Sequence, residues 1–116
     1  MIMLPSAVKI FLCTRPTDLR KSFDGLTGLV RECFDQDPLT GHLFLFLNRR
    51  RDRIKILYFD RDGLAIWYKR LEAGSYQMPQ TGAQDGIELQ PAQLAMLLSG
   101  IDLRTARQRK RFQRAG

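Results

Sequence analysis

The chain has 116 residues, of which 44% are hydrophobic, which is enough for one domain with its own core and too many for a wholly disordered chain. No apolar run reaches the roughly 18 residues that cross a bilayer, so the sequence predicts no transmembrane helix. The net charge of +7 comes mostly from residues 104–116, which hold six of the 19 basic residues and no acidic one. Such a tail is typical of an arm that binds polyanions, although a solvated helix end has the same composition.

The first predicted elements are a strand and an amphipathic helix. Val8 to Thr14 is a short apolar run, and Pro16 ends it because the residue before a proline is held extended. Thr17 is a suitable N-cap, and apolar residues recur at helical spacing from Asp18 to Phe34. The apolar stripe of this predicted helix consists of Leu19, Phe23, Leu26, Val30 and Cys33.

The start of this helix is rich in cations. Arg15 lies just upstream, and Arg20 and Lys21 lie in the expected first turn. Backbone N–H groups at a helix N-terminus attract anions, and nearby cations strengthen that attraction, so we expect a phosphate contact here. The alternative is that the cations pair with Asp18 and Asp24, which are within helical reach.

Residues 42–69 predict three consecutive antiparallel strands, because three short runs rich in aromatic and branched residues are separated by turn residues. The runs are His42–Asn48, Ile54–Asp60 and Leu64–Tyr68, and the third strand is expected to extend to Lys69. Asp62-Gly63 is a strong hairpin signal because glycine accepts positive φ. Leu64 to Gly74 also fits a helical stripe, and a strand followed by a helical turn ending at Gly74 is the favoured interpretation.

The first of these hairpins carries four arginines, Arg49, Arg50, Arg51 and Arg53. Guanidinium groups pair well with phosphate oxygens, so this tip is a candidate nucleic-acid contact. The alternative is that arginine only keeps an exposed turn soluble.

The remainder predicts a loop over residues 75–86, a short strand at Ile87–Leu89 and a helix at Pro91–Ser99. We therefore expect an α+β fold with a mostly antiparallel sheet of four or five strands and two helices, in the order β-α-β-β-β-(β)-α. The long helix should pack on one face of the sheet, with the second helix near it. This single domain should span residues 1–103, followed by a basic tail at 104–116 that packs poorly when free.

The two cysteines, Cys13 and Cys33, belong to no CxxC pair, and His42 is the single histidine of the chain. The sequence therefore supports neither a zinc site nor any other metal or cofactor. Buried, reduced thiols are typical of a cytoplasmic protein. The apolar N-terminus lacks a basic region and a cleavage site, so it is interpreted as a lead-in to the first strand, not as a signal peptide.

Three segments together resemble one known family over about Val8 to Asp102. The most specific pieces are Thr17–Lys21, then Asn48–Arg50 with Asp52–Lys55, and then Trp67–Leu71. They are similar to the TnpB accessory proteins encoded by the second reading frame of bacterial insertion sequences of the IS 66 group. One departure is Tyr76–Pro79, where the family often has a tryptophan before the proline.

The resemblance implies a role in bacterial transposition beside a separate transposase, which carries the catalytic acidic residues. It implies no catalytic mechanism and no cofactor, and it leaves the oligomeric state open. A bacterial cytoplasmic location follows, and DNA binding could place the protein on the nucleoid.

Three functions are compatible with these features. The first is a non-catalytic nucleic-acid-binding accessory protein, with DNA as the expected partner. The second is a protein module that docks the transposase without touching DNA. The third is a metal-dependent nuclease using Asp60 and Asp62, which are also ordinary hairpin residues.

The first function makes specific residues candidates for nucleic-acid contact. Tyr58, Trp67 and Tyr68 could stack on bases, although core packing is the better interpretation of Trp67. The candidate basic residues are Arg15, Arg20, Lys21, Arg49, Arg50, Arg51, Arg53, Lys55, Lys69, Arg70, Arg104, Arg107, Arg109, Lys110, Arg111 and Arg114.

Overall fold

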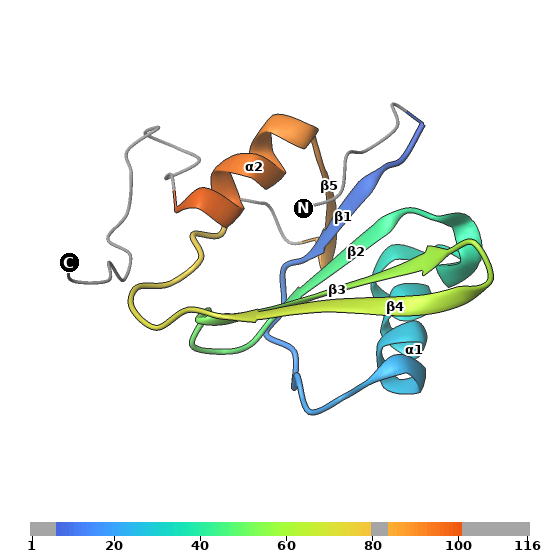
Figure 1. Ribbon diagram of the computed structural model, residues 1–116, viewed down its shortest axis with the longest axis horizontal. Coiled ribbons are helices and arrows are strands. Elements are labelled where there is room, and N and C mark those ends of the chain that lie inside the picture. Colours follow the sequence, from blue (N-terminus) through green and yellow to red (C-terminus); the bar gives the residue numbers. More distant parts are fainter. Residues whose placement is uncertain (1–6, 80–83, 101–116) are drawn as a thin grey trace.

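A five-stranded sheet forms the centre of the protein, as the computed structural model shows for residues 7–79 and 84–100 (Figure 1). The strands lie in the spatial order β4-β3-β2-β1-β5. β1 and β2 are parallel, and all other neighbours are antiparallel. The strands are β1 (Ile10–Cys13), β2 (Leu43–Leu47), β3 (Arg53–Asp60), β4 (Gly63–Arg70) and β5 (Gly86–Leu89).

Within the described residues, two α-helices and one short 3-10 helix accompany the sheet. They are α1 (Phe23–Phe34), η1 (Pro38–Thr40) and α2 (Pro91–Ser99). The expected α+β class and the expected order of elements are confirmed, and the last strand, which the sequence leaves optional, is present.

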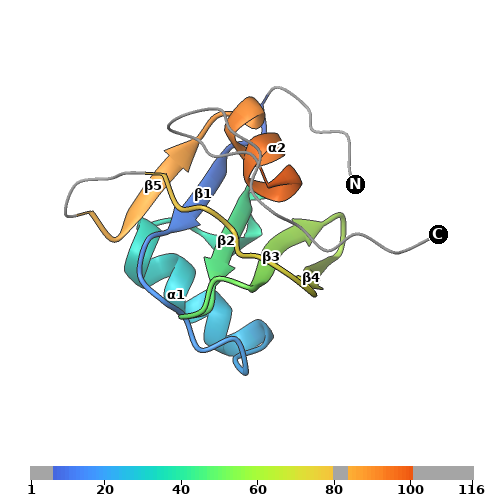
Figure 2. The ribbon, with the colours of Figure 1, turned by 90° about the vertical axis from the view of Figure 1, so that its left-hand side faces the viewer.

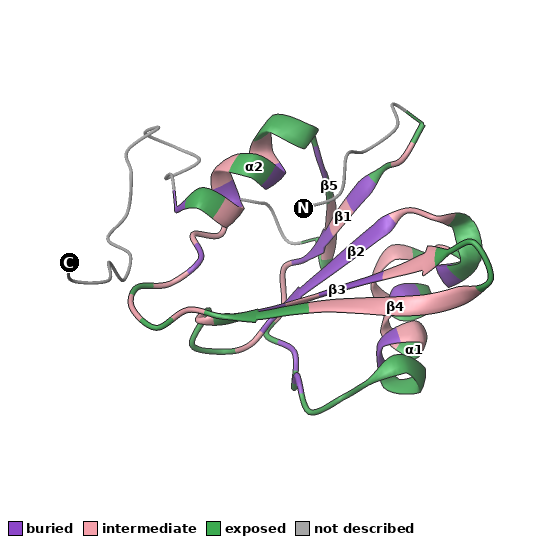
Figure 3. Cartoon of the chain, viewed as in Figure 1, coloured by how far each residue is buried: buried purple, intermediate pink, exposed green. Residues whose placement is uncertain are grey.

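The helices cover opposite faces of the sheet, as Figures 1 and 2 both show. All five residues of β2 are buried (Figure 3), and their side chains alternate between the faces. Phe44 and Phe46 belong to the core on the α1 side, whereas Leu43, Leu45 and Leu47 pack with the leucines of α2. The expectation that the second helix lies near the first was wrong, because a continuous apolar strand needs cover on both faces.

Helix α1 begins five residues later than the sequence pattern predicts. Its N-cap is Ser22, and Thr17 is instead buried in the preceding loop, where its N–H donates to the carbonyl of Leu47 (2.8 Å). Residues 18–21 form a separate turn, because the Asp18 side chain accepts the backbone N–H of Arg20 and competes with helix formation. Leu19, Leu26 and Val30 are buried as expected, but Phe23 is 43% exposed.

The segment after β4 is also different from the expectation. β4 extends to Arg70, which settles the choice between strand and helix for residues 64–70, and no helical turn follows at Gly74. The chain instead bends back along the loop between β2 and β3. The N–H of Leu71 donates to the carbonyl of Asp52, and the N–H of the fully buried Tyr76 donates to the carbonyl of Arg51, both at 2.7 Å.

The hairpin between β3 and β4 lies where Asp62-Gly63 predicts it. Asp60 pairs with Gly63, so the loop consists of two residues. The positive φ falls on Arg61 (58°), however, and Gly63 is already part of β4.

Residues 101–116, including the six basic residues of the tail, lie outside the described part of the chain. The proposed boundary between domain and tail therefore stays a prediction. Within residues 7–79 and 84–100, neither helix has the length and apolar character that crossing a membrane requires.

Gly86 provides a test of how α1 packs on the sheet. A Cβ at this position would lie 2.5 Å from Cδ1 of Phe34 and 2.7 Å from the carbonyl oxygen of Cys33. We expect Gly86→Ala to lower the free energy of unfolding by about 1–3 kcal/mol through overpacking. The matched control is Gly28→Ala in α1, where nothing lies within 4 Å of a new Cβ.

Gly28→Ala should raise the free energy of unfolding by up to about 1 kcal/mol through helix propensity. Urea unfolding of both variants measures the two effects. Equal stability of the Gly86 variant and the wild type would show that α1 does not pack closely on β5.

Candidate nucleic-acid interface

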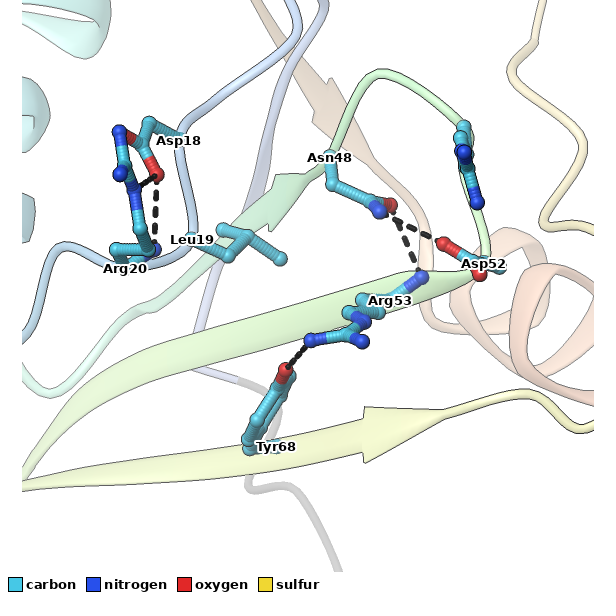
Figure 4. Close-up of a pocket in the computed structure, with 8 residues that line it drawn as sticks. Asp18, Leu19, Arg20, Asn48, Asp52, Arg53 and Tyr68 are labelled. Carbon is cyan, nitrogen blue, oxygen red and sulfur yellow. Dashed lines mark hydrogen bonds and ion pairs between the residues drawn. The ribbon is translucent and has the colours of Figure 1, made fainter.

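A groove of about 480 Å³ lies between the turn that precedes α1 and the loop that joins β2 to β3 (Figure 4). It contains three cations and two carboxylates, together with an aromatic ring from β4. Its lining residues are Asp18, Leu19, Arg20, Asn48, Arg50, Asp52, Arg53 and Tyr68. The fold thus brings together two of the predicted basic clusters, which are about thirty residues apart in the sequence.

Asn48 holds the β2–β3 loop in shape. Its Nδ2 donates to Oδ1 of Asp52 at 2.7 Å, and its Oδ1 accepts the backbone N–H of Arg53 at 3.0 Å. The carbonyl of Asn48 also accepts the N–H of Arg51, which takes a positive φ of 58°. The loop is therefore closed by both halves of one carboxamide, and its arginines start from a fixed backbone.

Tyr68 is the exposed aromatic residue of the groove. Its side chain lies on the same face of the sheet as α1, opposite Lys55 on β3, and the residue is 48% exposed. Nη1 of Arg53 donates to the Tyr68 hydroxyl at 3.1 Å (Figure 4), and Nζ of Lys55 lies 5.1 Å from the ring centroid. The ring is thus oriented by two cations and still presents accessible surface.

Lys55 connects this face of the sheet to the turn before α1. Its Nζ donates to the carbonyl of Lys21 at 2.9 Å. This partner is a neutral carbonyl and not a carboxylate. Among the described residues, Lys55, Arg50 and Arg53 have no carboxylate within 4.0 Å.

Arg20, by contrast, forms an ion pair within its own turn. Its Nη2 lies 2.7 Å from Oδ2 of Asp18, and its Nε donates to both oxygens of the same carboxylate. The pairing with Asp18, which was the alternative interpretation, is therefore the one that the structure shows. Because α1 starts only at Phe23, Arg20 and Lys21 precede the helix instead of lying in its first turn, and the phosphate contact predicted at the helix N-terminus stays a prediction.

Arg15 is held by the cysteines and acids on the other side of this turn. Its Nη2 lies 2.8 Å from Sγ of Cys33 and 3.5 Å from Oε1 of Glu32. The hydrogen bond to Cys33 raises the pKa of Arg15. Burial raises the pKa of Cys33, whose Sγ lies 3.6 Å from Sγ of Cys13, so the sulfur beside Arg15 is a protonated thiol at neutral pH.

None of the other predicted basic residues that the structure describes lines the groove. Lys21 and Arg15 line a smaller depression of about 210 Å³ on the far side of the turn. Lys69 pairs with Ile54 of β3, and both side chains lie on the α2 face, away from the groove. Arg70 lies on the groove face but forms an ion pair with Glu72 at 3.0 Å.

Arg49 and Arg51 are exposed on the same loop as Arg50 but do not line the groove. The six basic residues of the tail, from Arg104 to Arg114, lie outside the described residues. Tyr58 and Trp67 pack against the core on the α2 side, which agrees with the core interpretation of Trp67.

Asn48 and Asp52, which shape the loop, were not among the residues predicted from the sequence. An asparagine before a turn and an aspartate four residues later are a weak signal for side-chain closure of a loop. Asp60 and Asp62 lie at the opposite end of β3 from the groove. Within the described parts of the chain, no three His, Cys, Asp or Glu side chains group closely enough to hold a metal ion, so the geometry adds no residue to the nuclease hypothesis.

The Asp18–Arg20 pair predicts a specific titration. The Arg20 side chain, and then its backbone N–H, lower the pKa of Asp18 to about 2. A lowered pKa in the folded state means that the stability contributed by this carboxylate is present above about pH 4 and is lost as the pH falls toward about 2. In Arg20→Ala we expect the pKa to rise toward the ordinary value, as measured by NMR of the side-chain carboxyl carbon.

The control for this titration is Arg31→Ala, which removes an exposed arginine from the last turn of α1 and should leave Asp18 unchanged. An Asp18 carboxyl that titrates near its ordinary value in the wild type would contradict the pairing.

Comparison with known protein sequences places this chain in a family. An uncharacterized protein of Sinorhizobium fredii (strain NBRC 101917 / NGR234), y4hO, is 40% identical over 105 residues, which cover 88% of this chain and 90% of that protein. A second uncharacterized protein of the same strain, y4jC, is 32% identical over 96 residues, which cover 82% of this chain and 80% of that protein.

A shorter segment of 55 residues is 44% identical to part of the RNA pyrophosphohydrolase of Wolbachia pipientis wMel, covering 47% of this chain and 34% of that protein. No solved structure matches the chain. The family described as IS66 Orf2 like protein matches residues 8–108. The chain therefore belongs to the IS66 Orf2 family of insertion-sequence proteins.

Proposed function

We propose that this protein is a non-catalytic nucleic-acid-binding accessory protein that acts in transposition beside a separate transposase. The groove and the adjacent Lys55 form its contact surface for the phosphate backbone. The observation that carries the proposal is the placement of Arg50 and Arg53, both exposed and without a carboxylate partner among the described residues, beside the exposed ring of Tyr68.

The chemistry of these groups fits a nucleic acid. Arginine forks donate two parallel hydrogen bonds to phosphate oxygens, and lysine adds a point charge beside them. A base that is unpaired or at a strand end could stack on Tyr68, whose ring has one face near Lys55. Phosphate contacts carry no sequence information, so the groove supplies affinity and leaves the choice of site to other contacts.

The proposal narrows the predicted set of contact residues. Arg50, Arg53 and Lys55 form its centre, and the exposed Arg49 and Arg51 extend it along the loop. Arg15, Arg20 and Arg70 already have carboxylate partners, and Lys69 lies on the other face of the sheet. The tail contributes as a basic arm that follows the phosphate backbone.

Removing the two groove arginines should change how DNA binding depends on salt. For Arg50→Ala/Arg53→Ala we expect weaker binding to duplex DNA. The slope of log K against log salt should flatten by roughly 0.9 for each phosphate that the variant no longer neutralises. The fold should persist because exposed charges contribute less than about 1 kcal/mol each. Fluorescence anisotropy with terminal-repeat and random duplexes at several salt concentrations measures the slope.

The charge-matched control is Arg31→Ala/Arg61→Ala, which removes two exposed arginines outside the groove. This control should change the slope of log K against log salt much less than the groove variant does. Equal slopes for the groove variant and the wild type would show that the groove arginines do not contact phosphates, and the function would then have to be carried by the tail, by the turn before α1 or by a protein partner.

Releasing Arg20 should have the opposite effect. Asp18→Asn keeps an oxygen that can accept the Arg20 backbone N–H but removes the charge that holds the guanidinium. We expect DNA affinity at low salt to rise several-fold, with a slope steeper by up to about 0.9, because one more cation can reach a phosphate. Glu88→Gln on β5 makes the same change in net charge far from the groove and should have a smaller effect. An equal gain in both variants would mean that only net charge matters.

A further inference from the structure

The outer edge of β4 has no neighbouring strand among the described residues. β4 is the terminal strand of the sheet, and no other described part of the chain forms a backbone hydrogen bond with its outer side. Exposed edges are normally blunted by charges, prolines or bulges. Residues 63–68, Gly-Leu-Ala-Ile-Trp-Tyr, contain no charge and no proline, and β4 pairs with β3 without an interruption over eight residues.

The free backbone groups of this edge belong to alternate residues. Arg53 directs its carbonyl toward β2, where it accepts the N–H of Asn48 at 3.3 Å. Alternation along β3 and β4 then directs the N–H and C=O groups of Leu64, Ile66 and Tyr68 away from β3. These three residues offer a row of donors and acceptors to another strand.

A second copy of the same strand fits this row in antiparallel orientation. With Ile66 opposite Ile66 of the second copy, Leu64 of each copy lies opposite Tyr68 of the other. The free N–H groups of each strand can then donate hydrogen bonds to the free C=O groups of the other. On the other face of the sheet the same register places Trp67 opposite Ala65, a large residue beside a small one.

Charge complementarity selects this register. The end of β4 carries Lys69 and Arg70 and keeps one positive charge in excess of Glu72, which pairs with Arg70. The turn that precedes β4 carries Asp60 and Asp62 around Arg61 and has one negative charge in excess. In the register centred on Ile66, Arg70 of each copy lies opposite Asp62 of the other, so the two-fold symmetry produces two such pairs. A shift by two residues in one direction places Lys69 opposite Arg61 and moves Arg70 to the position of Asp60, which belongs to β3 and not to the open edge. A shift in the other direction removes the pairing of Arg70 with Asp62.

We propose that two copies of this protein associate through β4 to form a continuous ten-stranded sheet. The two-fold axis of an antiparallel strand pair is perpendicular to the sheet, so both α1 helices and both grooves lie on the same side. The two Tyr68 residues are then separated by about four residues along the strand direction, or about 13 Å. Because strand-edge pairing buries little surface, we expect a weak, concentration-dependent dimer.

The test is a charge exchange, carried out on the full chain without nucleic acid. Sedimentation equilibrium from micromolar to millimolar protein should show a monomer–dimer equilibrium for the wild type. Asp62→Arg alone or Arg70→Asp alone should each weaken dimerisation about tenfold, because each creates two like-charge pairs across the axis. The double variant Asp62→Arg/Arg70→Asp restores both attractions and should dimerise like the wild type.

Amide hydrogen exchange provides a second, independent measurement of the same interface. The N–H groups of Leu64, Ile66 and Tyr68 should become more protected as the protein concentration rises, whereas that of Glu88 on the other edge of the sheet should not. A wild type that stays monomeric at millimolar concentration would overturn the proposal. A dimer that forms equally well in both single variants would also overturn it.

Discussion

The side-chain amide of Asn48 fixes the loop on which the candidate interface depends. It holds Asp52 with its nitrogen and the backbone N–H of Arg53 with its oxygen. The segment after β4 adds two further hydrogen bonds to the same loop, from the N–H groups of Leu71 and Tyr76. Because the backbone of this loop is held from both sides, less backbone entropy is lost when its arginines bind a phosphate.

The position of the groove follows from how the sheet is covered. β2 is buried on both faces, so the fold needs a helix on each side (Figure 3). α1 covers the phenylalanines of β2 and Leu57 of β3, but the end of the sheet nearest the β2–β3 loop is left open. At this open end the alternation that buries Leu57 brings Lys55 and Arg53 to the surface of the same face.

Local patterns in the sequence predicted the elements well, and long-range geometry less well. The three central strands and the helix at 91–99 followed from apolar runs and turn residues. The start of α1 could not be predicted from spacing, because Leu19 continues the stripe while Asp18 forms a competing turn. The run Leu43–Leu47 already indicated a strand buried on both faces, which is the signal that places α2 opposite α1. The basic clusters were visible in the sequence, but the ion pairs that distinguish Arg20 from Arg50 appear only in the fold.

The central claim is that the groove face of the sheet contacts nucleic acid, and NMR titration of the isotope-labelled protein with a short DNA duplex tests it most directly. We expect the largest chemical-shift changes at Arg50, Arg53, Lys55 and Tyr68, with smaller changes in the turn at residues 18–21. The side-chain signals of the groove arginines should also move, since they meet the phosphates. Changes confined to α2 and Lys69 on the opposite face, or none in the described domain at a saturating concentration of DNA, would contradict the account.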